Sequence, residues 1–204
     1  MVRCKKWSGK TVVFLVTAVL AVFALSCYFF SENTKAKSKI YDLETDITYN
    51  DFNVTGDRQK DKIKIRTDKD SSGYISKLSV IINGKKIFSK RYGDSSVQEL
   101  RQYPQVKLIE LKKGKKLLYI HMSTYNGYYS GGWIYKIRPK LLRCLLKTKT
   151  IVRDYNKKYP KAWRTGERIK RVKGNRITFS VSSYTTKEKK YTFKYRNGRL
   201  YRRK

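Results

Sequence analysis

Apolar and polar residues alternate with a period of two along several stretches of this chain, and that pattern places narrow limits on the fold. A period of two puts successive side chains on opposite faces of a strand, whereas a helix needs a period near 3.6. The clearest stretches are 62–66, 78–82, 177–181 and 191–195. Asn83-Gly84 and Asn197-Gly198 each stand between strand-like stretches and are typical of two-residue hairpin turns. We therefore predict a mainly β fold, an antiparallel sheet or meander of about ten to twelve short strands, partial-propeller or sandwich-like, with at most a turn or two of helix within 154–163.

An uncharged stretch of twenty residues, 11–30, is the only long hydrophobic run. As one helix it can cross a hydrocarbon core of roughly 30 Å. Positive residues tend to stay on the cytoplasmic side, and the preceding segment carries four cations and no acid, namely Arg3, Lys5, Lys6 and Lys10. We predict a single-pass protein of the cell membrane whose domain lies outside. Its parts are a basic cytoplasmic tail (1–10), a transmembrane anchor (11–30), a linker (31–39) and one extracytoplasmic β domain (40–204).

Two other fates of this stretch stay open. Cys27 follows Leu25-Ser26, which resembles part of a bacterial lipoprotein box, where the cysteine is lipidated. Simple cleavage as a signal peptide is the third possibility. The stretch exceeds the roughly 7–15 apolar residues of a signal peptide, so we favour a retained anchor. In all three cases the domain is exported or tethered to the membrane.

The formal charge of +34 is concentrated in the second half of the chain. Residues 31–100 contain 14 basic and 11 acidic residues, whereas 101–204 contain 31 basic and four acidic residues, a net charge of +27. Such a field attracts polyanions, and the attraction weakens with salt. We therefore expect an anionic partner: a wall polymer outside the cell, or nucleic acid if the topology is inverted.

The segment from Asn53 to Asp61 runs directly into the alternating stretch 62–65. It resembles the aspartate-rich calcium loop of FG-GAP or VCBS-like repeats. It is also similar to β-repeat domains of membrane-anchored, exported Gram-positive (clostridial-type) proteins without an assigned activity. Those domains continue with an Asn-Gly-Lys-Lys hairpin and a Gly-Lys-Lys-Leu-Leu-Tyr-Ile strand, matched here by 83–87 and 114–120.

The resemblance implies a calcium site built from alternating oxygen ligands. By position, a backbone carbonyl would come from Gln59, and side-chain oxygens from Asn53, Thr55, Asp57 and Asp61. This chain departs from the pattern, because Asn53 replaces an aspartate and Arg58 replaces a glycine. We expect a loop that keeps the turn and has lost the ion, with calcium binding as the alternative and no other cofactor.

Two groups of aromatic residues are candidates for ligand contact, because aromatic faces stack on sugar rings or bases. The first is a glycine-rich segment with Tyr125, Tyr128, Tyr129 and Trp133. The second combines aromatic and basic residues, namely Lys157, Lys158, Tyr159, Lys161, Trp163 and Arg164. Loops whose aromatic residues simply pack on the sheet are the alternative.

Catalysis is not expected. His121 is the only histidine, it lies in a strand-like stretch, and no neighbouring residue marks it as a base. The three cysteines leave only Cys144 in the domain, which rules out an internal disulfide there and a metal site built from cysteines. We predict a non-enzymatic cell-surface domain that binds an anionic polymer. The alternatives are an envelope protein that docks a protein partner and a cytoplasmic domain that binds nucleic acid.

Overall fold

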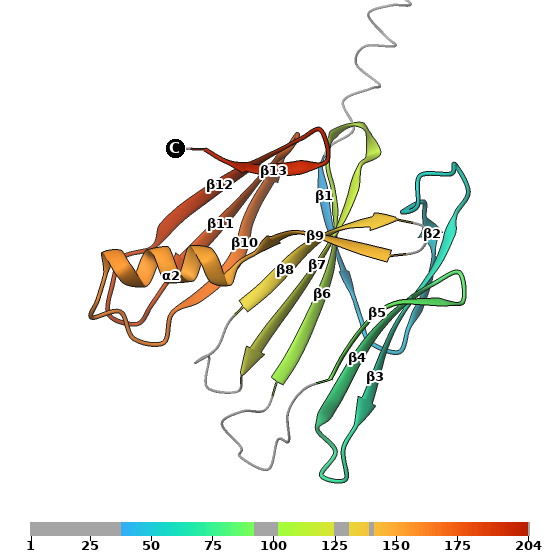
Figure 1. The fold of residues 1–204 in the computed structure, drawn as a ribbon, viewed down its shortest axis with the longest axis horizontal. Coiled ribbons are helices and arrows are strands. Elements are labelled where there is room, and N and C mark those ends of the chain that lie inside the picture. Colours follow the sequence, from blue (N-terminus) through green and yellow to red (C-terminus); the bar gives the residue numbers. More distant parts are fainter. Residues whose placement is uncertain (1–37, 92–101, 125–130, 139–140, 204) are drawn as a thin grey trace, which may run out of the picture. The chain divides into compact units, whose positions relative to one another are not determined.

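A computed structural model describes residues 38–91, 102–124, 131–138 and 141–203 of the chain. Within these residues thirteen strands form three antiparallel sheets, accompanied by one α-helix and one short 3₁₀ helix (Figure 1). Residues Lys37–Lys204 pack as a single compact unit. In the described residues no helix is long and apolar enough to span a membrane; the predicted anchor 11–30, with Cys27, lies outside them.

The central sheet has the strand order β1-β6-β7-β8-β9. Four of its strands follow one another in the chain as a meander: β6 (Gln102–Glu110), β7 (Lys116–Thr124), β8 (Gly131–Arg138) and β9 (Leu141–Lys147). The 3₁₀ helix η2 (Lys112–Gly114) joins β6 to β7. The meander is extended at its β6 edge by β1 (Lys39–Leu43), which pairs antiparallel with β6.

The N-terminal sheet is a second meander, of β2 (Thr48–Phe52), β3 (Asp61–Lys69), β4 (Ile75–Ile82) and β5 (Lys85–Arg91). The predicted hairpin between β4 and β5 is confirmed. Asn83 and Gly84 both have positive φ, 50° and 77°, as a type I′ turn requires.

The C-terminal sheet is a third meander, of β10 (Gly166–Lys173), β11 (Arg176–Ser182), β12 (Lys189–Arg196) and β13 (Arg199–Arg202). The turn between β12 and β13 repeats the same geometry, with φ of 49° at Asn197 and 76° at Gly198. Helix α2 (Lys149–Lys158) connects the central sheet to this meander.

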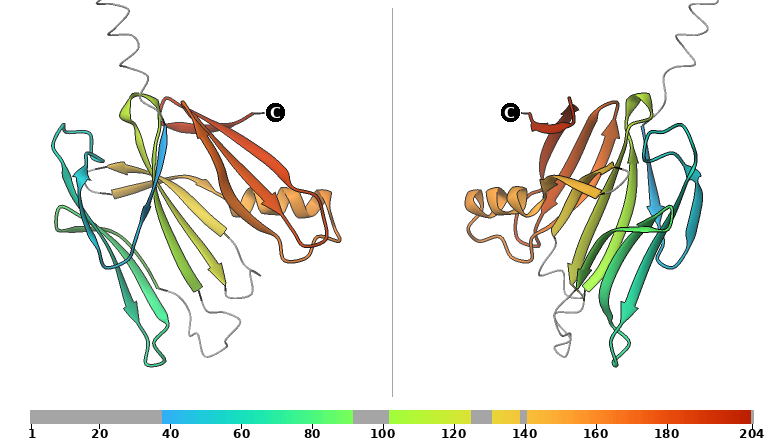
Figure 2. Two further views of the ribbon diagram at one scale, coloured as in Figure 1. Left: turned by 180° about the vertical axis from the view of Figure 1, so that it is seen from behind. Right: turned by 45° about the vertical axis from the view of Figure 1, so that its right-hand side comes forward.

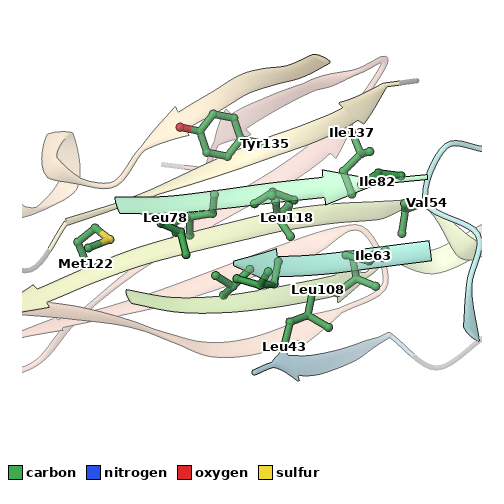
Figure 3. Close-up of a cluster of buried hydrophobic side chains, with 14 residues drawn as sticks. Leu43, Val54, Ile63, Leu78, Ile82, Leu108, Leu118, Met122, Tyr135 and Ile137 are labelled. Carbon is green, nitrogen blue, oxygen red and sulfur yellow. The ribbon is translucent and has the colours of Figure 1, made fainter. Parts of the chain in front are cut away.

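The central sheet is buried on both faces, because each face belongs to a separate hydrophobic core (Figure 2). Strand β7 divides its side chains between them by simple alternation. Leu118 and Met122 belong to the first core, shared with the N-terminal sheet and drawn in Figure 3. Leu117 and Tyr119 belong to the second core, shared with the C-terminal sheet and α2. Full burial of such a side chain contributes about 1.5–3 kcal/mol, so β7 stabilises both interfaces.

The outer faces of the two flanking sheets are polar. In β3 the buried Ile63 and Ile65 alternate with Lys62 and Arg66, which are exposed. On β12 the buried Tyr191 and Phe193 alternate with charged residues in the same way. Tyr201 on β13, 48% exposed and opposite Lys194, is an apolar exception on the outer face of the C-terminal sheet.

The predicted mainly β, antiparallel class is confirmed, but two details of the prediction were wrong. The described residues contain thirteen strands rather than ten to twelve. Helix α2 spans Lys149–Lys158, so it begins five residues before the predicted 154–163 turn and has ended before Trp163. Its helical period is visible in the buried Ile151 and Tyr155, four residues apart, which face the second core.

Gly132 on β8 provides a test of the packing between β7 and β8. A Cβ atom at Gly132 would lie 2.8 Å from Cε2 of Tyr119 and 2.9 Å from the carbonyl oxygen of Ile120. We expect Gly132→Ala to lower the free energy of unfolding by about 1–3 kcal/mol, because the methyl group overpacks this site. The measurement is denaturant unfolding of the full-length protein in mild detergent, followed by circular dichroism.

The matched control is Gly131→Ala, because a Cβ atom at Gly131 meets nothing within 4 Å. Only a small change in stability is expected there. An equal loss in both variants would contradict the steric explanation.

Candidate functional site

A basic groove lies on the outer face of the C-terminal sheet. Its volume is about 420 Å³. Strands β10, β11 and β12 and the residue that follows β13 line it: Arg171, Lys173, Arg176, Thr178, Lys190, Thr192 and Arg203. Five of these seven side chains are cations, and none is an acid.

Strand alternation brings these residues to one face. On β11, Ile177 and Phe179 point into the second core, so Arg176 and Thr178 lie on the opposite face. The register places Thr178 directly opposite Thr192 on β12, and their hydroxyl oxygens are 3.0 Å apart. Strand β10 pairs with the other edge of β11. There Arg171 lies opposite Thr178, and Lys173 lies opposite Arg176.

The five cations of the groove form no ion pair with any carboxylate of the described residues. By contrast, Glu188, directly before β12, forms ion pairs with Lys170 at 2.5 Å and with Arg168 at 3.9 Å. The hydrogen bond from Lys170 lowers the pKa of Glu188 below its ordinary value. The groove therefore presents guanidinium, ammonium and hydroxyl groups together, which suits phosphate, sulfate or carboxylate groups.

The predicted basic-aromatic group is brought together only in part. Trp163 is exposed, with the Arg164 guanidinium 4.3 Å from its ring centroid, and Tyr184 lies beside both, 6.3 Å from Trp163. Tyr159 instead packs against Tyr155 at 4.9 Å, on the edge of the second core. The remaining members are exposed, namely Lys157 and Lys158 at the end of α2, and Lys161 beyond it.

The predicted glycine-rich aromatic segment is mostly outside the described residues, including Tyr125, Tyr128 and Tyr129. Trp133 is described, and it lies half-buried on β8 against the first core. The Lys90 ammonium lies 4.0 Å from the centroid of its ring, and burial lowers the pKa of Lys90. Trp133 does not line the basic groove.

The predicted calcium loop is closed by hydrogen bonds to its own oxygens. Asp61 is 1% exposed and accepts hydrogen bonds from Val54 N at 2.6 Å, Thr55 N at 2.9 Å and Asn83 Nδ2 at 2.7 Å. The Thr55 hydroxyl contacts the same carboxylate at 3.0 Å. Asp61 thus ties the loop to the β4–β5 turn.

The other proposed calcium ligands have local partners too. Asn53 Oδ1 accepts from Gly56 N at 2.8 Å, and Asp57 Oδ1 accepts from Gln59 N at 3.0 Å. Among the described residues, no three His, Cys, Asp or Glu side chains come together as a metal site. Calcium binding here stays a prediction.

A buried polar cluster between the central and C-terminal sheets was not predicted. His121 Nε2 lies 3.6 Å from Glu167 Oε1, and both side chains are nearly inaccessible to solvent. The Thr148 hydroxyl accepts from Gly132 N at 2.6 Å and contacts the same glutamate oxygen. Burial, together with the nearby Glu167 carboxylate, raises the pKa of Tyr119 above its ordinary value. The cluster links β7, β8, the start of α2 and β10, so we interpret it as structural.

The sequence contains a pattern from which the groove could have been predicted. Alternation within 176–182 and 189–196 assigns their cations and threonines to one face of the sheet, opposite the apolar residues. The partner of His121 had no such signal, because Glu167 is 46 positions away and meets it only after two sheets have packed. Comparisons with protein-family models, with curated proteins and with solved structures found no match, so the interpretation of these sites relies on their geometry.

Asp61 provides a test of the loop. Burial raises the pKa of Asp61, but the hydrogen bonds from Thr55, Val54 and Asn83 outweigh burial and hold this pKa below its ordinary value. The stability that Asp61 contributes is therefore present above its unfolded-state pKa of about 3.9 and is lost as the pH falls through its lower folded-state pKa. We expect Asp61→Asn to destabilise the domain by about 1–3 kcal/mol at pH 7, since an amide presents N–H groups to backbone donors.

The measurement is the free energy of unfolding of both proteins from pH 7 down to pH 3. The gap between wild type and Asp61→Asn should narrow as the pH falls below the unfolded-state pKa of about 3.9, because the unfolded wild type then binds a proton more readily than the folded state does. A gap that is constant with pH would mean that the ionised carboxylate is not what the loop requires.

Proposed function

We propose that this protein is a membrane-anchored, cell-surface β domain that binds an anionic polymer, with a wall polymer favoured, and has no enzymatic activity. The basic groove on the C-terminal sheet carries the proposal, because its lining contains five cations and no acid. Three of those cations are arginines, whose planar guanidinium groups pair with phosphate or carboxylate through two hydrogen bonds.

Charge distribution along the chain supports the same proposal. The net charge of +27 over 101–204 includes the groove cations and would raise the local concentration of a polyanion. The anchor over 11–30 would hold the domain at the membrane surface.

We also propose the resemblance of this domain to FG-GAP or VCBS-like domains, which rests on the arrangement of its sheets and on the loop 53–61. Three consecutive antiparallel meanders that pack face to face are compatible with a partial propeller, and the loop 53–61 leads directly into β3. A sandwich-like description would also accommodate the two cores.

Charge reversal in the groove tests the proposed function. We expect Arg171→Glu combined with Arg176→Glu to weaken binding of inorganic polyphosphate and of purified wall polymer on the order of 100-fold, because like charges then face the ligand. For the wild type, raising salt from about 50 to about 200 mM should weaken binding by a similar factor, since about five cations release counterions. Fluorescence anisotropy with labelled polymer measures both effects on the full-length protein in detergent.

The matched control is Lys62→Glu combined with Lys85→Glu, exposed positions on the N-terminal sheet. It makes the same change in net charge away from the groove, and less than about a threefold effect is expected because exposed charges beyond the screening length interact weakly. An equal loss in both double variants would contradict the groove as the binding site. Binding to a protein of the envelope that does not change with salt would favour the docking alternative instead.

Protease treatment of intact cells tests the proposed topology. We expect the domain to be cleaved from the cell surface, and the membrane-bound remnant to retain Met1 and residues 11–30. Intact mass of the remnant measures this outcome. A domain that is cleaved only after lysis would place it in the cytoplasm and favour nucleic acid as the ligand, and a lipid-modified remnant that begins at Cys27 would replace the anchor with a lipoprotein.

A further inference from the structure

Trp163 and Tyr184 are the two most exposed large hydrophobic side chains of the described residues, at 52% and 77%. They come from two loops that flank the same pair of strands, one before β10 and one after β11. Their ring centroids are 6.3 Å apart, and the ring planes are inclined at 53°. Two aromatic rings held together in solvent leave apolar surface available to a ligand.

Hydrogen bonds between the two loops hold this pair in place. Tyr184 N donates to the Trp163 carbonyl oxygen at 3.2 Å, and Trp163 N donates to Thr185 Oγ1 at 3.2 Å. The Thr185 hydroxyl in turn donates to the Lys161 carbonyl oxygen at 2.9 Å. A surface that is already ordered loses little conformational entropy when it binds.

Arg164 adds a cation to the aromatic pair. Its guanidinium carbon lies 4.3 Å from the centroid of Trp163 and 5.8 Å from that of Tyr184. Its φ of 52° is in the left-handed region, which an arginine rarely adopts. Unfavourable backbone geometry of this kind persists where the surroundings hold it, and it is concentrated at functional sites.

We infer that Trp163, Arg164 and Tyr184 form a subsite for a sugar ring that carries a negative charge. The C–H face of a sugar packs on an aromatic ring, and the guanidinium can pair with a carboxylate or phosphate on that sugar. The Ser183 and Thr185 hydroxyls on either side of Tyr184 are engaged in hydrogen bonds within the two loops, which helps to hold the tyrosine in position. A flat nucleobase sandwiched between both rings fits less well, because the two ring planes are inclined at 53° rather than parallel.

This subsite deepens the proposed function and depends on it for the identity of the polymer. Strand β11 connects the two sites, since Arg176 lines the groove at one end of the strand and Tyr184 follows the other end. The seven residues of β11 span roughly 23 Å, a length that several units of a linear polymer can cover. One anionic polysaccharide chain can therefore contact the groove through its charges and the subsite through a ring.

The experiment compares three labelled probes on the full-length protein in detergent: polygalacturonate, which has charged sugar rings; inorganic polyphosphate, which has charge alone; and single-stranded oligothymidylate. We expect Trp163→Ala to weaken polygalacturonate binding about five- to tenfold, the range of one stacked ring, and to leave polyphosphate binding within about twofold. Arg171→Ala, in the groove, should weaken both. Arg164→Gly, which suits the left-handed backbone, should weaken polygalacturonate more than polyphosphate, because it removes the cation from the aromatic pair.

A second measurement tests the subsite independently of the groove. Monomeric galacturonate should quench a part of the tryptophan fluorescence that is absent from Trp163→Ala. If the wild type binds none of the three probes but this quenching is present, the proposed function fails and the subsite stands. The subsite is overturned if Trp163→Ala leaves polygalacturonate binding unchanged, if it weakens polyphosphate equally, or if its largest effect falls on oligothymidylate.

Discussion

The two-sided burial of the central sheet is the constraint on which the rest of this structure depends. Strand β7 sends Leu118 and Ile120 into one core and Leu117 and Tyr119 into the other, all nearly inaccessible to solvent. A slip of one residue in its pairing would exchange the two faces and separate His121 from Glu167. The contact of His121 with Glu167 therefore favours the observed register, because a buried imidazole is costly without a polar partner.

The same alternation that builds the cores also sorts the charges. Each flanking sheet has one apolar face, so most of its Lys, Arg and Thr residues lie on the other; Lys90, over Trp133, is an exception. On the C-terminal sheet this sorting occurs on three neighbouring strands at once, and the register then sets Thr178 beside Thr192 with cations on both sides. The groove is thus a direct consequence of β pairing in a sequence with 31 basic and four acidic residues after position 100.

The fold class could be predicted from the sequence because alternation and Asn-Gly turns are local signals. Strands β1 and β2 lack clean alternation, as their half-buried and exposed positions show, which is why a strand count from pattern fell short. The sequence-based prediction placed the helix too far toward the C-terminus. Ile151 and Tyr155 are isolated apolar residues in the sequence, and only the second core shows that they share a buried helix face.

The candidate sites also contain parts that the sequence could predict and parts that it could not. Trp163 and Arg164 are neighbours in sequence and could be proposed together, whereas Tyr184 joins them only through contacts between two loops. Nothing in the sequence separated Tyr159, which packs on the second core, from the exposed Trp163 close by.

Folding alone does not explain why the groove lacks acids. Like charges that face one another repel, at about 1 kcal/mol for a pair 4 Å apart even in water. The N-terminal sheet avoids this cost, since Asp68 lies 2.8 Å from Lys77 and 3.4 Å from Arg66 on its surface. An acid at the position of Thr178 or Thr192 would reduce the positive charge of the groove without disturbing the core, because both side chains lie on the face opposite the buried residues. Five cations without an ion-pair partner among the described residues are the observation on which the proposal of an anionic ligand rests, and they support it more directly than the total charge does.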